Sequence, residues 1–126
     1  MIDLFQLGEF TLASGQTSKF KIECDALTPG DWEGLAYMAS TRLKPFSEVH
    51  GVPRGGIPFA TALEKYITPG ANRILIAEDV VTTGGSIKKF LSDFDRKGND
   101  LSIVCVFSRG TVDLADDFRT LFVMAG

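Results

Sequence analysis

Two adjacent acids, followed by a run of hydroxyl and glycine residues, form the part of the sequence best suited to chemistry. Glu78 and Asp79 end an apolar run, and Thr82-Thr83-Gly84-Gly85-Ser86 follows after Val80 and Val81. Glycines let backbone N–H groups approach an anion closely, hydroxyls add hydrogen-bond donors, and a helix beginning here would contribute about half a positive charge. The segment is therefore predicted to hold one phosphate group.

The acids indicate what carries that phosphate. Carboxylates repel phosphate but accept hydrogen bonds from vicinal hydroxyl groups, so Glu78 and Asp79 suit a sugar whose hydroxyls lie close to its phosphate. We therefore expect a ribose 5-phosphate. The segment has neither the lysine of a P-loop nor the glycine spacing of a dinucleotide fold. An ordinary strand-to-helix loop flanked by acids is the alternative.

Two further loops would meet this segment, because ligands of open parallel sheets bind beyond the carboxyl ends of the strands. Gly51-Val52-Pro53-Arg54-Gly55-Gly56 leads into a helical pattern, and its guanidinium and backbone N–H groups suit a diphosphate. The alternative is a tight turn with an exposed arginine. In Ser108-Arg109-Gly110, the arginine could reach a base or a carboxylate, or pair with Asp113, Asp116 or Asp117.

The elements that must position these loops alternate between helical and strand periodicity. We expect helices from Asp31 as N-cap to Leu43, over 57–66, and from Ile87 through Phe94 to a stop at Gly98. We expect strands over 46–51, 74–77, 101–107 and 120–125. This order predicts an α/β fold with a mostly parallel sheet flanked by helices.

The chain is predicted to be one domain, 1–126, with a small N-terminal hood over 1–28 and an α/β core over 29–126. Its 126 residues are 44% hydrophobic, and Phe10, Leu12, Phe20 and Ile22 suggest extended pieces of the hood around a turn at Ser14-Gly15-Gln16.

The composition also excludes several classes of partner. A net charge of −3, without a basic run, argues against a nucleic-acid partner. The N-terminus lacks a secretory or membrane-spanning stretch, so we expect a cytoplasmic protein. Cys24 and Cys105 lie in apolar runs and are expected to be buried, reduced thiols, and His50 is expected to pack or to make a hydrogen bond.

The sequence resembles the type I phosphoribosyltransferases, and most closely the orotate-using branch of that family. The specific motif is the stretch 74–86, with its two acids and its Thr-Thr-Gly-Gly-Ser run. Residues 8–15 with Ser18 resemble the family's hood, Gly55-Gly56-Ile57-Pro58 with Ala60 its diphosphate loop and helix, and Ser108-Arg109-Gly110 its base-contacting segment. Nearly the whole chain is covered in the same order.

The resemblance implies Mg²⁺-dependent transfer of a phosphoribosyl group from 5-phosphoribosyl diphosphate to a nitrogen base, with orotate expected and a homodimer as the assembly. Glu78, Asp79 and Arg54 are the implied catalytic residues, and no residue is named as a metal ligand. The implied donor-binding residues are Val52, Pro53, Arg54, Gly55, Gly56, Glu78, Asp79, Val80, Val81, Thr82, Thr83, Gly84, Gly85 and Ser86. The base would meet Lys19, Phe20 and Arg109, although Lys19 and Lys21 alone would suit a solvated edge. A cis peptide is expected at Pro53-Arg54.

The chain also departs from the family. Only residues 67–73 join the helix after the diphosphate loop to the next strand, where the orotate enzymes insert a strand and a mobile basic loop. Ala13 stands where those enzymes commonly have a lysine that binds diphosphate, and the sequence ends soon after the last expected strand, where those enzymes continue into further helices. A non-catalytic protein that binds the donor is therefore the alternative function, and a generic phosphate-binding domain is a third.

Overall fold

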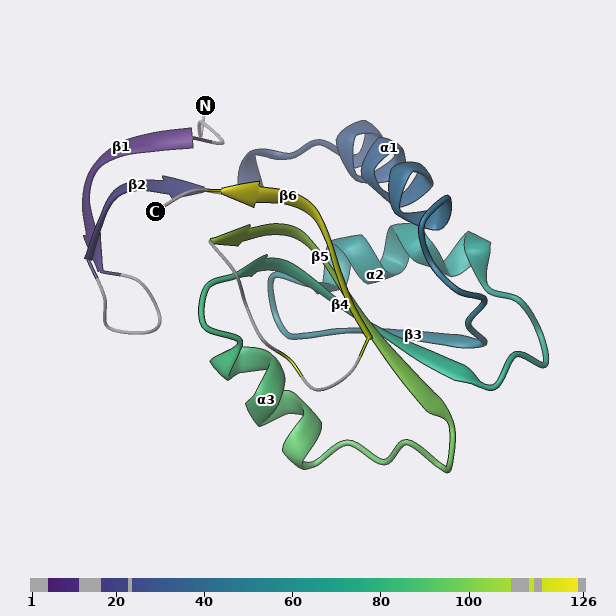
Figure 1. Ribbon diagram of the computed structural model, residues 1–126. Helices are drawn as coiled ribbons and strands as arrows, with labels where there is room; N and C mark the ends of the chain where they lie inside the picture. The colour runs from purple at the N-terminus through teal and green to yellow at the C-terminus, as the bar shows by residue number, and fades with distance from the viewer. Residues whose placement is uncertain (1–4, 12–16, 23, 110–113, 115–116, 125–126) are drawn as a thin grey trace.

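A four-stranded parallel sheet forms the centre of the molecule in the computed structural model, which describes residues 5–11, 17–22, 24–109, 114 and 117–124 (Figure 1). The strands are β3 (Glu48–Gly51), β4 (Arg73–Val81), β5 (Asp100–Arg109) and β6 (Asp117–Met124), side by side in that order. The apolar centres of β4 and β5 are fully buried because helices cover both faces of the sheet. The predicted α/β fold is confirmed.

The helices divide between the two faces. α1 (Pro29–Ser40) and α2 (Ile57–Leu63), with the 3₁₀ turn η2 (Glu64–Tyr66), pack on one face, where Trp32, Phe59 and Leu75 share a core cluster. α3 (Gly85–Ser92) packs on the other face, where Ile87 meets Ile76 and Ile103. β3 leads into α2 and β4 leads into α3, each through a loop at the carboxyl edge of the sheet.

An antiparallel ribbon of β1 (Phe5–Thr11) and β2 (Thr17–Ile22) precedes a short 3₁₀ turn, η1 (Cys24–Ala26), and then α1. In Figure 1 this ribbon lies on the side toward which the arrowheads of β4, β5 and β6 point. The predicted strand pieces of the hood are thus confirmed, while the predicted turn at 14–16 lies outside the described residues.

Three predicted helix boundaries are wrong, and the first has an identifiable reason. Thr28, not Asp31, is the N-cap of α1: its hydroxyl accepts a hydrogen bond from Asp31 N at 3.2 Å, and Asp31 Oδ2 accepts one from Thr28 N at 2.9 Å. This capping box begins the helix three residues earlier than predicted. α1 also ends at Ser40, and α3 ends at Ser92, well before Gly98.

The strands also begin and end elsewhere than predicted. β4 and β5 continue through Glu78, Asp79, Ser108 and Arg109, so these polar residues belong to the sheet and not to the loops. β3 is shorter than predicted and forms one edge, where His50 bonds Glu48 at 3.2 Å and packs edge-on against Phe94. Both cysteines of the chain are buried, as expected, and they form no disulfide with each other. Among the described residues, no helix is long and apolar enough to cross a membrane.

Candidate active site

Three predicted site segments converge at the carboxyl edge of the sheet. Gly51 pairs with Ala77, and Val52 N donates to Ala77 O at 2.9 Å, so the first loop leaves β3 directly beside β4. On the other side of β4, Val81 pairs with Ser108, which precedes Arg109. Neighbouring parallel strands thus bring together groups that lie far apart in the sequence.

The two acids on β4 occupy different environments. Glu78 is 6% exposed and pairs across the sheet with Cys105, whereas Asp79 is only half-buried. Burial, together with the hydrogen bond and the charge of Asp79, raises the pKa of Glu78 to about 9. Glu78 is therefore protonated at neutral pH, so the carboxylate that faces solvent is that of Asp79.

Backbone hydrogen bonds hold both acidic side chains in place. Glu78 Oε1 accepts from Asp79 N at 3.0 Å, and Asp79 Oδ1 accepts from Val80 N at 2.7 Å. Burial also raises the pKa of the Cys105 thiol behind Glu78 to about 12, so that this side of the pair is neutral at ordinary pH. The negative charge of the site is thus concentrated on Asp79.

The amino end of α3 offers backbone donors a few residues further on. Gly84 is its N-cap with φ of 85°, a left-handed conformation that favours glycine, and no side chain caps the described helix start. Gly85 N makes only a long bond of 3.4 Å to Thr83 Oγ1. Since Thr83, Gly85 and Ser86 are exposed, their amides and hydroxyls can reach an anion in front of the helix.

The loop after β3 folds tightly against β4. The Pro53-Arg54 peptide is cis, as expected, and Gly56 N donates to Val52 O at 2.9 Å. A Cβ at Gly56 would fall 2.9 Å from Val52 N, so only glycine fits there. The Arg54 side chain is exposed, in a position to meet a ligand in solution.

The predicted base-binding residues come from two different parts of the fold. Arg109 ends β5 and is 9% exposed. Burial lowers the pKa of its guanidinium, but the ordinary pKa of arginine is so high that the side chain stays charged. Lys19 and Phe20 belong to β2, which pairs with β1, so the hood and not the sheet positions them. Ala13 lies outside the described residues.

The described residues include no group of three or more His, Cys, Asp or Glu side chains that could hold a metal ion. Mg²⁺ in phosphate sites keeps several waters and takes few protein ligands, so such a cluster is not required. The residues of this site are compatible with Mg²⁺ if the ion binds together with a ligand that supplies further oxygens. Asp79 is the nearby negative charge.

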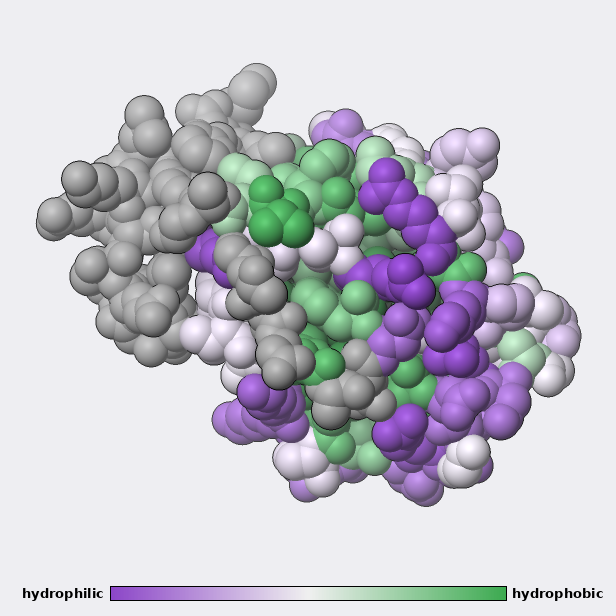
Figure 2. Space-filling model, in the orientation of Figure 1, coloured by the Kyte–Doolittle hydropathy of each residue, from purple (hydrophilic) through white to green (hydrophobic). Residues whose placement is uncertain are grey.

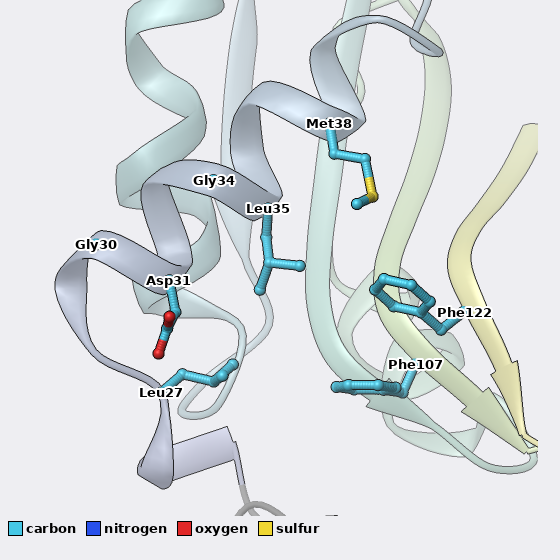
Figure 3. A pocket seen from close by; sticks show the side chains of 8 residues that line it. All are labelled: Leu27, Gly30, Asp31, Gly34, Leu35, Met38, Phe107 and Phe122. Atoms are coloured by element: carbon cyan, nitrogen blue, oxygen red, sulfur yellow. The ribbon is translucent and has the colours of Figure 1, made fainter.

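A separate apolar groove was not predicted from the sequence. It has a volume of about 650 Å³ and lies between α1 and the strands β5 and β6, where Leu35 and Met38 extend toward Phe107 and Phe122 (Figure 3). The glycines Gly30 and Gly34 on α1 also line it and were its only sequence signal. None of the predicted site residues lines the groove, so this groove is not the predicted donor site.

Comparison with solved structures places the fold. The crystal structure of orotate phosphoribosyltransferase from Aeropyrum pernix superposes with a TM-score of 0.74 at 21% identity, covering 95% of this chain and 88% of that one. This likeness shows a shared fold. No protein-family model matches the chain.

Two curated relatives narrow the class. Orotate phosphoribosyltransferase of Methanosarcina mazei is 30% identical over 124 aligned positions, which cover 77% of this chain and 66% of the relative. That of Methanosarcina acetivorans is 31% identical and covers 64% of this chain and 58% of the relative. The chain belongs to the type I phosphoribosyltransferase family, and it spans two thirds or less of the length of these two relatives.

The alignment also bears on the departures from the family. The alignment with the M. mazei relative has 124 positions, but 77% of this 126-residue chain is fewer residues than that. At the remaining positions, the relative has residues for which this chain has none. In the structure, η2 ends at Tyr66 and β4 begins at Arg73, which leaves no room for a further strand between them. The short link agrees with the missing loop predicted from the sequence.

Proposed function

We propose that this chain binds 5-phosphoribosyl diphosphate and transfers its phosphoribosyl group to a nitrogen base, with orotate as the acceptor. The observation that carries the proposal is the convergence of the 52–56 loop, the Asp79 carboxylate and the uncapped start of α3 at one sheet edge. Arg54 of this loop is a cation that suits a diphosphate, and the Asp79 carboxylate is an acceptor that suits ribose hydroxyls. The backbone amides at the start of α3 suit a 5-phosphate. The named relatives support the same chemistry.

In the proposed reaction, a ring nitrogen of the base forms a bond to the anomeric carbon while the bond from that carbon to diphosphate breaks. The amides and hydroxyls from Thr82 to Ser86 hold the 5-phosphate, and Asp79 accepts hydrogen bonds from the ribose hydroxyls. The negative charge of Asp79 also stabilises the positive charge that develops on the ribose ring. Arg54 meets the departing diphosphate.

If Mg²⁺ binds together with the donor, Asp79 is the side chain whose charge would help to hold it. When bound, it supplies neutralisation of the diphosphate that leaves. The rest of the chemistry belongs to the protein side chains and the α3 amides, so no covalent intermediate with the protein is required.

A second function, donor binding without turnover, is favoured by one specific observation. The link over 67–72 is too short to carry a mobile basic loop over the diphosphate. If each missing cation acted as one preorganised donor, its loss would lower the rate by about 10²-fold. Binding would then persist while transfer becomes slow or stops.

One experiment distinguishes these functions. Purified protein is mixed with Mg²⁺ and 5-phosphoribosyl diphosphate, and diphosphate release is followed with orotate, uracil, adenine and hypoxanthine, while calorimetry measures donor binding. Release that depends on orotate supports the transferase. Binding without release supports the binder, and the absence of binding contradicts both.

The acceptor is tested separately through Arg109, whose charge at the end of β5 suits the carboxylate of orotate. Arg109→Ala should weaken orotate use far more than donor binding. Equal losses in both would remove Arg109 from the acceptor site.

A further inference from the structure

Gly55, in the loop after β3, lies in unusually close contact with one of the two acids. A Cβ at this position would fall 2.8 Å from Asp79 Cγ and 2.9 Å from Asp79 Oδ1. The Asp79 carboxylate therefore occupies the volume that a side chain at position 55 would fill.

Neither partner of this contact can easily move away. Asp79 Oδ1 accepts from Val80 N at 2.7 Å, which fixes the carboxylate from the strand side. The loop is fixed by the bonds from Val52 N to Ala77 O and from Gly56 N to Val52 O, both 2.9 Å. A turn of the carboxylate would therefore break its hydrogen bond from Val80 N, and a shift of the loop would break backbone hydrogen bonds.

Three described glycines elsewhere in the chain lack this constraint. A Cβ at Gly34, Gly70 or Gly98 would have no heavy atom within 4 Å. Gly34 has an ordinary helical position in α1 and lies away from the sheet edge, so Gly34→Ala is a matched control for Gly55→Ala.

We propose that Gly55 is a positioning residue, which sets the orientation of the Asp79 carboxylate and couples the 52–56 loop to it. The proposal rests on the proposed function, in which Asp79 binds the ribose hydroxyls and Arg54, next to Gly55, meets the diphosphate. A methyl group at position 55 pushes the carboxylate or the loop aside. Asp79 and Arg54 then no longer have the relative positions needed to bind the ribose and the diphosphate of one donor molecule.

The first measurement is affinity for ribose 5-phosphate by calorimetry. Gly55→Ala should bind at least about tenfold more weakly than the unaltered protein, since displacements of about 1 Å in a binding site have effects of this size or larger. Gly34→Ala should bind within about twofold. If the unaltered protein binds and Gly55→Ala binds equally well, the positioning role is wrong; if the unaltered protein does not bind, the proposed function itself fails.

The second measurement needs no ligand. The side-chain ¹³C carboxyl signal of Asp79 is recorded by NMR at one pH, and its chemical shift should change in Gly55→Ala but not in Gly34→Ala. A signal unchanged by Gly55→Ala would overturn the proposal even if binding is weakened, because a general structural defect would then explain the loss.

A third variant covers the case in which Gly55→Ala folds poorly. Asp79→Ala removes the carboxylate and makes room for the new methyl group, so the double variant should have a higher thermal midpoint than Gly55→Ala alone. A double variant no more stable than the single one would show that Gly55 does not act through Asp79, and would also overturn the proposal.

Discussion

At the scale of single residues, the two acids on β4 have different environments despite their adjacency. The sequence suggests two equivalent carboxylates, but Glu78 is buried with a pKa raised to about 9 and Asp79 is half-buried beside the loop. A neutral Glu78 can donate a hydrogen bond, whereas an ionised one would repel Asp79. We therefore expect Glu78 to support Asp79 and not to bind ribose on equal terms.

Amide substitutions test this inequality. Glu78→Gln keeps the neutral state and shape of the protonated acid, so affinity for ribose 5-phosphate should stay within about threefold. Asp79→Asn removes the charge that accepts the ribose hydroxyls and should weaken binding by at least about tenfold. Calorimetry measures both, and equal losses in the two variants would contradict the assignment.

The buried acid also predicts a pH dependence of stability. The pKa of Glu78 rises from 4.5 to about 9 on folding, so its stabilising effect is complete below pH 4.5 and is lost as the pH rises toward about 9. Within that window the free energy of unfolding should fall by about 1 kcal/mol per pH unit. Urea unfolding at several pH values measures the slope, and Glu78→Gln, which cannot titrate, should flatten it.

At the scale of elements, the start of α3 depends on one backbone conformation. Gly84 has φ of 85° and Gly70, in the 67–72 link, has φ of 84°, so alanine is strained equally at both positions. Each substitution should cost about 1 kcal/mol of stability. Only Gly84→Ala should also weaken binding of inorganic phosphate, because only Gly84 precedes the amides of the helix start. Equal phosphate affinities in the two variants would place the anion elsewhere.

The sequence was sufficient for the central elements and less so for their ends. The apolar run 74–77 predicts β4 correctly because its burial requires nothing but apolar side chains. The strand continues past Glu78 and Asp79 because Glu78, Val80 and Val81 pair with β5, which side-chain polarity does not reveal. Similarly, α1 begins at Pro29 because Thr28 and Asp31 cap it reciprocally. In the sequence, Asp31 can be either the N-cap itself or the third residue of a helix that Thr28 caps.

The same limit applies to the site. Residue types alone identified the 52–56 loop, the acids and the glycine run, since each chemistry requires particular groups. The contact between Gly55 and Asp79 could not be predicted, because it depends on the distance between two strands. The pair of glycines after Arg54 was its only signal.

At the scale of the whole molecule, the sheet ends at β3, a strand of four residues with polar Glu48 and His50. A short, polar edge strand resists pairing with other chains, so β3 is protected as an edge. The short 67–72 link leaves out the segment that would carry cations to the diphosphate. Arg54 is then the cation that the described 52–56 loop offers.

A comparison of two ligands tests this consequence. With Mg²⁺ present, 5-phosphoribosyl diphosphate should bind no more than about tenfold more tightly than ribose 5-phosphate, because few protein groups meet the added diphosphate. Arg54→Gln should remove most of that difference while leaving ribose 5-phosphate affinity unchanged. A preference much larger than this would indicate cations from a part of the chain that the structure does not describe.

The buried thiol of Cys105, behind Glu78, can be used to measure how often the centre of the sheet opens to solvent. Cys105 is fully buried, and its pKa of about 12 leaves almost no thiolate at neutral pH. Alkylating reagents attack the thiolate, so labelling of Cys105 requires that the centre of the sheet first open to solvent. The rate of alkylation therefore measures how often β5 becomes exposed, and ligands that close the carboxyl edge of the sheet should slow it.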